Sequence, residues 1–126
     1  MDKGPHVVGW KLDAQQRIEL LQAFPPRYRR TVADHVTLQT GAGDDAPLPT
    51  EYNGEIVGLA DDGAGVEALV VSIGGTTDRP DGSSYHITWS LAAGRQAKES
   101  NDVLASRGWE AISPPMPVIL HPARFP

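Results

Sequence analysis

Short runs of alternating apolar and polar residues, separated by Gly, Pro and Asp, dominate the chain. Residues two apart in a strand point to the same face, so this alternation is typical of strands with one buried face. The strands that the pattern predicts cover residues 6–12, 31–39, 55–60, 66–73, 85–91 and 116–120. The sequence Asp-Asp-Gly-Ala-Gly at 61–65 has the composition of a tight turn, so we expect the strands on either side of it to form a hairpin.

Two helices are expected between the strands. Asp13, followed three residues later by Gln16, forms a capping-box arrangement at the start of an apolar run with helical spacing, which two successive prolines end. A second helix is expected to begin at Ser100 or Asn101, both common N-cap residues, and to end at Gly108. Prolines surround the last strand, and because proline donates no backbone hydrogen bond, we expect this strand at the edge of a sheet.

The two halves of the chain have a similar organisation. Each half holds one predicted helix and one predicted strand with a His-x-Thr motif. We therefore expect a single domain over residues 1–126, composed of two similar lobes at roughly 1–60 and 61–126 that face each other.

The two motifs, His35-Val36-Thr37 and His86-Ile87-Thr88, carry the candidate chemistry. On each strand the histidine and the threonine share one face, and the apolar residue between them points to the other. Imidazole titrates near neutral pH, so one ring can act as a base while the other acts as an acid on the opposite side of a phosphorus atom. Threonine hydroxyls can donate to the non-bridging oxygens, where negative charge develops. The pattern is therefore suited to in-line displacement at phosphorus.

Two other interpretations of these histidines stay open. Short motifs arise by chance, and half-buried strand histidines bonded to the backbone or to a nearby threonine would give the same pattern. Four histidines with several aspartates would also suit zinc in principle, but no pair of histidines has the spacing of metal ligands. We expect neither a metal nor a cofactor.

With the hydrophobic residue that follows each motif, His35-Val36-Thr37-Leu38 and His86-Ile87-Thr88-Trp89 resemble the signature of the two-histidine (2H) phosphoesterases. This superfamily includes the bacterial 2′-5′ RNA ligase-like proteins and the cyclic phosphodiesterase domains of RNA-repair proteins. The resemblance implies a compact bilobal α+β fold. In it, two small antiparallel sheets with one helix per lobe surround a central cleft that contains both motifs.

The resemblance also implies an activity and the roles of four residues. The expected reaction is metal-independent hydrolysis of a 2′,3′-cyclic phosphate, on an RNA end or a nucleotide, to a 2′-phosphate. His35 and His86 would be the acid–base pair, with His86 as the base and His35 as the acid. Thr37 and Thr88 would bind the phosphate.

Charge and composition narrow the expected partners. The chain has no cysteine and a net charge of −5. Proteins that hold long nucleic acids carry basic surfaces, because neutralising phosphates supplies most of their affinity. We therefore expect a small nucleotide or an RNA terminus with a cyclic phosphate as partner, and no long duplex. No apolar run reaches membrane-spanning length, so we expect no membrane partner and a cytoplasmic monomer.

Five further residues are candidates for substrate contacts. Tyr28 and Tyr52 lie in predicted loops and would suit stacking on a nucleobase. Arg30 belongs to a short basic run, which an ordinary solvated loop explains as well. Lys98 and Ser100 precede the second helix, where anions are favoured, although N-capping alone would account for Ser100.

The same sequence features fit other functions. A phosphodiesterase of cyclic dinucleotide or oligonucleotide signals would use the same motifs, and substrate choice would then depend on the loops 41–53 and 74–84. A non-catalytic module that binds nucleotides or RNA ends would keep the fold without needing two titrating groups. An α+β interaction domain with coincidental motifs is the remaining alternative.

Overall fold

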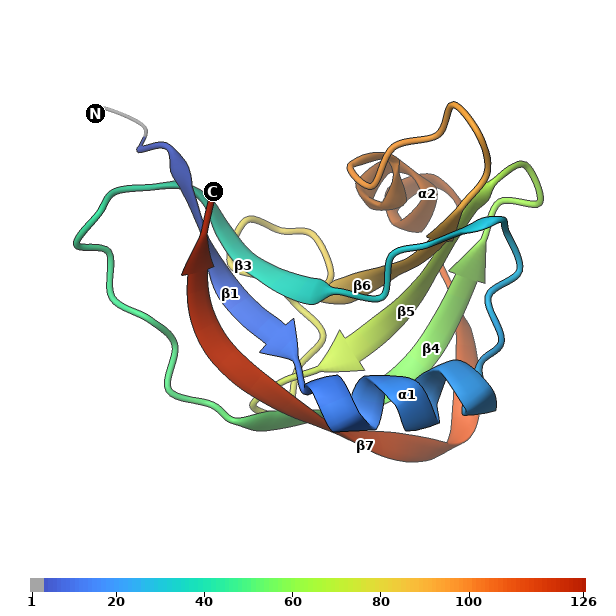
Figure 1. Ribbon diagram of the computed structural model, residues 1–126, viewed down its shortest axis with the longest axis horizontal. Coiled ribbons are helices and arrows are strands. Elements are labelled where there is room, and N and C mark those ends of the chain that lie inside the picture. Colours follow the sequence, from blue (N-terminus) through green and yellow to red (C-terminus); the bar gives the residue numbers. More distant parts are fainter. Residues whose placement is uncertain (1–3) are drawn as a thin grey trace.

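The structure is a computed structural model that describes residues 4–126, which form seven strands and two helices (Figure 1). In chain order these elements are β1 (His6–Leu12), α1 (Ala14–Ala23), β2 (Arg30–Thr31), β3 (His35–Ala42), β4 (Asn53–Asp61), β5 (Val66–Ser72), β6 (His86–Leu91), α2 (Glu99–Arg107) and β7 (Glu110–Phe125). The expected hairpin is present, since β4 and β5 pair on either side of the turn at 62–65.

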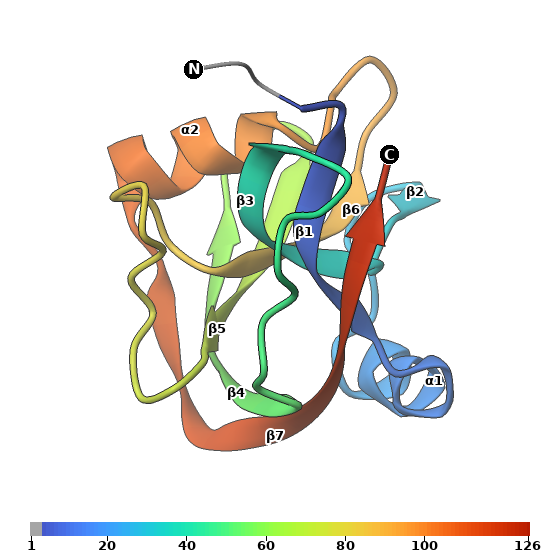
Figure 2. The same cartoon turned by 90° about the vertical axis from the view of Figure 1, so that its left-hand side faces the viewer.

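Six of the strands form one closed antiparallel barrel (Figures 1 and 2). The strand order is β6-β3-β1-β7-β4-β5, and pairing of β5 with β6 closes the circle, while the short β2 adds to β6. The expected compact bilobal α+β fold, with two small sheets around a central cleft, is therefore wrong. The described residues contain a single continuous sheet, to which the two helices are attached.

The chain order explains why two lobes do not form. Strands β1 and β3, from the first half of the sequence, are inserted between β6 and β7 from the second half. Residues 1–60 and 61–126 therefore do not separate into units with cores of their own. The alternation along each strand indicates which face is buried, but it does not identify the neighbouring strand, so two small sheets and one barrel fit the same pattern.

Large aromatic side chains fill the barrel interior. Trp10 and Trp89 are almost fully buried, and their indole N–H groups donate to the carbonyl oxygens of Glu51 (3.0 Å) and Phe24 (2.7 Å). Tyr85 packs edge-on against Trp10, with ring centroids 5.7 Å apart. Satisfying each indole N–H allows these rings to be buried without an unpaired donor.

Helix α2 covers part of the outer face of the barrel, above β5 and β6 in Figure 1. It buries Val103 and Leu104 against a small apolar cluster that includes Val66 and Val70 of β5. Strand β5 is therefore buried on both faces, which explains its nearly continuous apolar sequence.

The ends of the two helices differ in how well the sequence predicted them. In α1, Asp13 accepts a hydrogen bond from the backbone N–H of Gln16, as the capping box predicts. Helix α2 ends before Gly108, which has a positive φ of 69°, but it begins at Glu99. Ser100 and Asn101 therefore lie inside its first turn, and the prediction that one of them is the N-cap is wrong.

Strand β7 is not the edge strand that its prolines predict. It spans 16 residues and pairs with β1 on one side and β4 on the other. Between the pairs Gly58↔Ala111 and Ile56↔Met116, one residue of β4 faces residues 112–115 of β7, which arch away from the ladder. Two of the prolines fall in this arch, where no backbone donor is needed.

A kink interrupts the predicted strand 31–39 just before the first motif. Ala33 has a positive φ of 44°, a conformation that non-glycine residues rarely adopt, and its side chain is fully buried. Arg17 of α1 holds the kink, because its guanidinium donates to the carbonyl oxygens of Ala33 (2.7 Å) and Val32 (3.2 Å). The chain stays hydrogen-bonded to β6 through the kink and starts β3 at His35, so the kink sets the direction in which the first His-x-Thr motif enters β3.

A bulge follows within β3. Val8 of β1 pairs with Gln39, and Gly9 pairs with Thr37, which leaves Leu38 without a partner on β1. An extra residue of this kind reverses the alternation of faces along its strand. Strict alternation would place certain residues before and after Leu38 on opposite sides of the sheet. With the bulge, these residues can face the same side.

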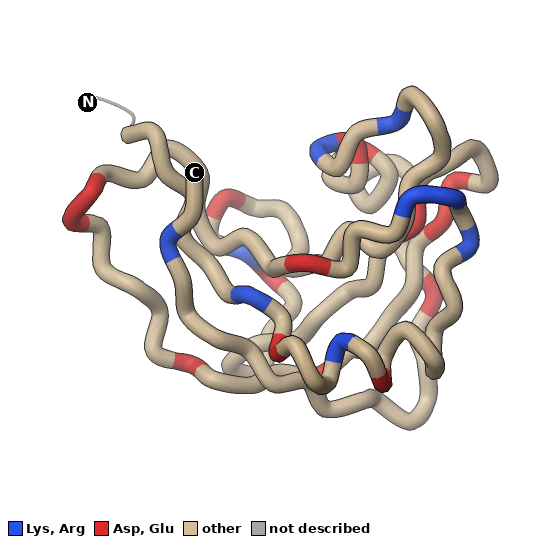
Figure 3. Tube along the Cα trace, in the orientation of Figure 1, with Lys and Arg blue, Asp and Glu red and all other residues tan. Residues whose placement is uncertain are grey.

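Charged residues of both signs are spread along the chain. Figure 3 shows Lys and Arg positions interspersed with Asp and Glu positions along the trace. Within residues 4–126, no helix has both the length and the apolar character needed to cross a membrane.

The close approach of β1 to β3 predicts the effect of a single methyl group. A Cβ at Gly9 would lie 2.1 Å from the carbonyl oxygen of Val36, so we expect Gly9→Ala to force the strands apart. The free energy of unfolding should fall by at least about 1–3 kcal/mol, measured by chemical denaturation. Gly43→Ala is the matched control, because its Cβ would meet only the Asp45 side chain, at 3.5 Å. Equal stability of the two variants would contradict this account.

Candidate functional site

One residue pair brings the two motifs together. Val36 of β3 is opposite Ile87 of β6, and both side chains are fully buried in the barrel interior. The histidine and threonine of each motif flank this pair and therefore point to the outer face. Continuing the antiparallel register places each histidine beside the threonine of the other motif. The two histidines then lie on a diagonal, a separation of about 7–8 Å in a regular sheet.

A cavity of about 170 Å³ lies over this outer face. Both histidines and both threonines of the motifs line it, together with Thr40, Arg79, Ala97, Lys98 and Asn101. Thr40 reaches the cavity because of the bulge in β3, since strict alternation would point it to the same side as Val36. The cavity thus combines two imidazoles, three hydroxyls and two cationic side chains.

The hydrogen bond of His86 determines which of its ring nitrogens is free. Its Nδ1 lies 2.9 Å from the carbonyl oxygen of Ser84. A carbonyl oxygen only accepts, so Nδ1 carries the proton and Nε2 of the neutral ring keeps its lone pair. Burial lowers the pKa of His86, and the charges of Arg79 and His35 lower it further, against the opposing effect of the Ser84 hydrogen bond. His86 is therefore in the form of a base at neutral pH.

His35 has a different partner. Its Nδ1 lies 3.0 Å from a carboxylate oxygen of Asp34, and the same oxygen accepts from the Lys11 ammonium at 2.7 Å. Partial burial opposes the charged form of Asp34, but the hydrogen bonds from Lys11 and His35 outweigh it and hold the pKa of Asp34 below its usual range. The ring of Phe125 packs edge-on against His35, with centroids 4.8 Å apart. These contacts fix the imidazole and give it an anionic counter-charge at Nδ1.

Thr88 is held by residues at the start of α2. Its Oγ1 lies 3.3 Å from the carbonyl oxygen of Ala97 and 2.9 Å from Oγ of Ser100. If Ser100 donates to Thr88, the threonine proton has only the long bond to Ala97 and can turn to another acceptor. Ser100 is fully buried and does not line the cavity, so the structure places it behind Thr88 instead of against a substrate.

Arg79 is the principal cavity residue that sequence reasoning missed. It lies in the loop between β5 and β6, and only 8% of the residue is exposed. Its Nε and Nη2 donate to the two carboxylate oxygens of Asp81, at 3.0 and 2.7 Å, and Nη2 lies 3.5 Å from Oδ1 of Asn101. The hydrogen bonds from Arg79, followed by those from Ser83, hold the pKa of Asp81 well below its usual range. This ion pair fixes a guanidinium at the cavity wall.

The other predicted contacts divide between the cavity and distant positions. Lys98 lines the cavity, as the sequence suggested that it could. Tyr28 instead donates its hydroxyl proton to Asp61 at 2.5 Å, and Arg30 donates to the carbonyl oxygen of Arg95 at 3.0 Å. Tyr52 is 70% exposed and does not line the cavity.

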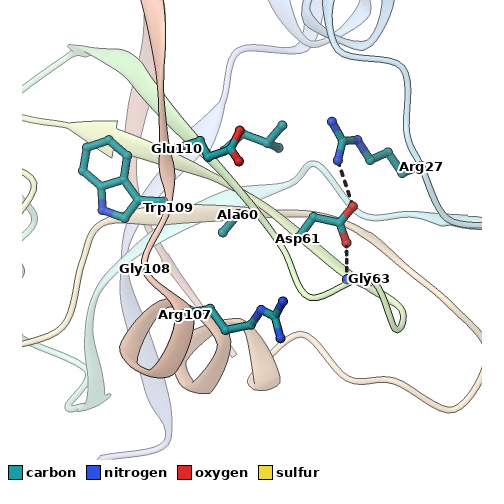
Figure 4. Close-up of a pocket in the computed structure, with 9 residues that line it drawn as sticks. Arg27, Ala60, Asp61, Gly63, Arg107, Gly108, Trp109 and Glu110 are labelled. Atoms are coloured by element: carbon teal, nitrogen blue, oxygen red, sulfur yellow. Dashed lines mark hydrogen bonds and ion pairs between the residues drawn. The ribbon is translucent and has the colours of Figure 1, made fainter.

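A second, larger cavity lies at the C-terminal end of α2 (Figure 4). Its volume is about 360 Å³, and Arg27, Asp61, Arg107 and Glu110 contribute to its walls. Arg27 is directed at Asp61, with 2.9 Å between Nη1 and Oδ2, and Trp109 also contributes to the cavity wall. The cavity contains no histidine, so it offers no group that titrates near neutral pH.

The arrangement of the smaller cavity suits acid–base chemistry on an anion. One imidazole is held neutral and the other is paired with a carboxylate, while Arg79 and Lys98 supply positive charge. Among residues 4–126, no group of three or more His, Cys, Asp or Glu side chains has the arrangement of a metal site.

The pKa of His86 can be measured without any substrate. Because burial disfavours the imidazolium, we expect an NMR titration of the His86 ring to give a pKa below 6.5, the ordinary value for histidine. In Arg79→Gln the pKa should rise towards 6.5, since one positive charge is removed. A pKa at or above 6.5 in the unsubstituted protein would contradict the burial of this ring.

Comparisons with known proteins do not assign the chain to a family. No protein-family model, no curated protein and no solved structure matches it. What the site does must therefore be inferred from the residues that form it.

Proposed function

We propose that the protein is a metal-independent phosphoesterase of the two-histidine type. It hydrolyses the 2′,3′-cyclic phosphate of a nucleotide or RNA end to a 2′-phosphate by acid–base catalysis. The observation that carries this proposal is the β3–β6 register, which turns both motifs towards one cavity. We place its action in the cytoplasm.

In the proposed reaction, His86 acts as the base. Water attacks phosphorus, and Nε2 of His86 takes the proton of that water as the new P–O bond forms. The hydrogen bond from Nδ1 to Ser84 and the lowered pKa both favour the neutral ring that this step requires.

His35 acts as the acid on the opposite side of the phosphorus atom. The bond from phosphorus to O3′ breaks, and O3′ takes a proton from Nε2 of His35, which leaves the phosphate on O2′. Asp34, bonded to Nδ1, orients the ring and balances the charge of the imidazolium before the transfer. Exchange of protons with solvent then restores both histidines.

The phosphate oxygens meet several donors in this scheme. The hydroxyl groups of Thr37 and Thr88 and the cations Arg79 and Lys98 all belong to the cavity wall. Donors that are fixed before the reaction stabilise the charge that develops on the non-bridging oxygens. The ion pair with Asp81 provides this fixation for Arg79.

The central test is hydrolysis of a 2′,3′-cyclic nucleotide in the presence of EDTA, followed by phosphorus NMR. We expect a nucleoside 2′-phosphate as product, and a loss of roughly 10²–10⁴-fold in rate for either His35→Ala or His86→Ala, the range typical of general acid–base catalysis. His121→Ala is the matched control, because His121 lies on β7 outside the cavity, where its ring is bonded to Asp13, the N-cap of α1.

Each alternative outcome has a defined meaning. Full activity in either cavity variant would rule out the two-histidine mechanism. Phosphate-dependent binding of the nucleotide without hydrolysis would instead favour a non-catalytic binding module.

Arg79 provides an independent test of where the reaction takes place. Removing one fixed donor to the developing charge should lower kcat/KM of Arg79→Gln by roughly 10²–10³-fold. Arg107→Gln, in the larger cavity of Figure 4, should leave kcat/KM unchanged. The reverse pattern in steady-state kinetics would place the reaction in the larger cavity.

A further inference from the structure

A groove of about 410 Å³ adjoins the histidine cavity. Leu38, Gln39 and Thr40 of β3 form one wall, and Pro80 and Asp81 of the loop before β6 form the other; these five residues define the Leu38–Pro80 groove. In Figure 2 this loop, drawn in yellow, lies below α2. Thr40 lines both the groove and the cavity, so the two spaces are neighbours.

The size of the histidine cavity indicates that part of the substrate lies outside it. Pockets that enclose drug-sized ligands have volumes of roughly 300–1,000 Å³. At about 170 Å³, the histidine cavity falls below this range. It can hold the cyclic phosphate and adjoining ribose atoms, while the base, attached to the same ribose, must extend into neighbouring space.

We propose that the Leu38–Pro80 groove binds the base of the nucleotide whose cyclic phosphate occupies the histidine cavity. The proposal rests on the proposed phosphoesterase function and names the part of the substrate that determines its binding. The occupant is a nucleobase joined to a ribose cyclic phosphate.

The lining of the groove matches the two surfaces of a nucleobase. Leu38 and Pro80 offer apolar contact to the faces of the ring, and Gln39, Thr40 and Asp81 offer polar groups to its edges. The amide of Gln39 both donates and accepts, so it can serve any of the four bases. The groove therefore distinguishes a substrate with a base from one without, and it does not select among the four bases.

Two structural details connect the groove to the chemistry. The bulge leaves Leu38 unpaired on β1, at the point where β3 passes from the cavity to the groove. On the other wall, Arg79 lines the cavity, and its partner Asp81 lines the groove. One ion pair thus sets the distance between the phosphate subsite and the base subsite.

The test compares two cyclic phosphodiesters in each variant. One is 2′,3′-cyclic AMP, and the other is ethylene phosphate, which has the same five-membered ring but neither ribose nor base. We expect Leu38→Ala to lower kcat/KM about tenfold for cyclic AMP and to leave the value for ethylene phosphate unchanged. The ratio of the two activities is independent of the fraction folded, which matters because Leu38 also packs against the core.

Two further variants support this comparison. Pro80→Ala changes the opposite, exposed wall and should show the same selective loss, and Ile119→Ala is the control, because Ile119 is 47% exposed on β7 and lies outside the groove. An equal effect on both substrates, or no effect on either, would overturn the proposal.

A second measurement separates failure of the groove from failure of the proposed function. If the protein hydrolyses neither substrate, the phosphoesterase proposal fails, and calorimetric binding of adenosine 2′-phosphate and inorganic phosphate tests the groove alone. Tighter binding of the nucleotide, with the preference lost in Leu38→Ala, would support the groove. Equal binding of the two ligands by the unsubstituted protein would overturn it.

Discussion

The contact between β3 and β6 is the constraint on which the candidate site depends. These strands share the single pair Val36↔Ile87, while β3 pairs with β1 along its other edge. The kink at Ala33 lies between β2, which also pairs with β6, and this contact, and the bulge at Leu38 follows it. Because both motifs flank one pair, their polar residues have a common face, over which the cavity lies.

Helix α2 and the loop before β6 supply the remaining walls of the site. Helix α2 is held on the barrel by its own apolar residues, and its first turn supports Thr88 and contributes Lys98 and Asn101 to the cavity. The loop before β6 adds Arg79, fixed by Asp81. Strand β3 and three segments between residues 79 and 101 therefore surround one cavity, and the barrel keeps their relative positions.

The sequence predicted local structure better than long-range pairing. The capping box of α1, the turn at 61–65 and the strand at β6 depend on neighbouring residues, and all three are present. The barrel closure and the central position of β7 depend on contacts between distant strands, which alternation does not encode. The prolines were misleading because an arch of β7 accommodates two of them away from the ladder.

The same distinction holds for the candidate site. The motifs identified four residues that the fold does turn towards one cavity, since a repeated pattern on strands carries its own geometry. Arg79 had no such pattern, because its place depends on the ion pair with Asp81 and on the path of a loop. Tyr28, Arg30 and Tyr52 matched a chemical requirement only by residue type, and the fold places all three away from the cavity.

The hydrogen-bond partners of the two histidines differ in whether a substitution can remove them. His86 is bonded to the main-chain carbonyl group of Ser84, which every side chain at that position would retain. His35 is bonded to the carboxylate of Asp34, which a single codon change removes. Divergence among descendants of this protein should therefore alter the His35 half of the pair first, and leave the orientation of His86 as an inherited property of the backbone.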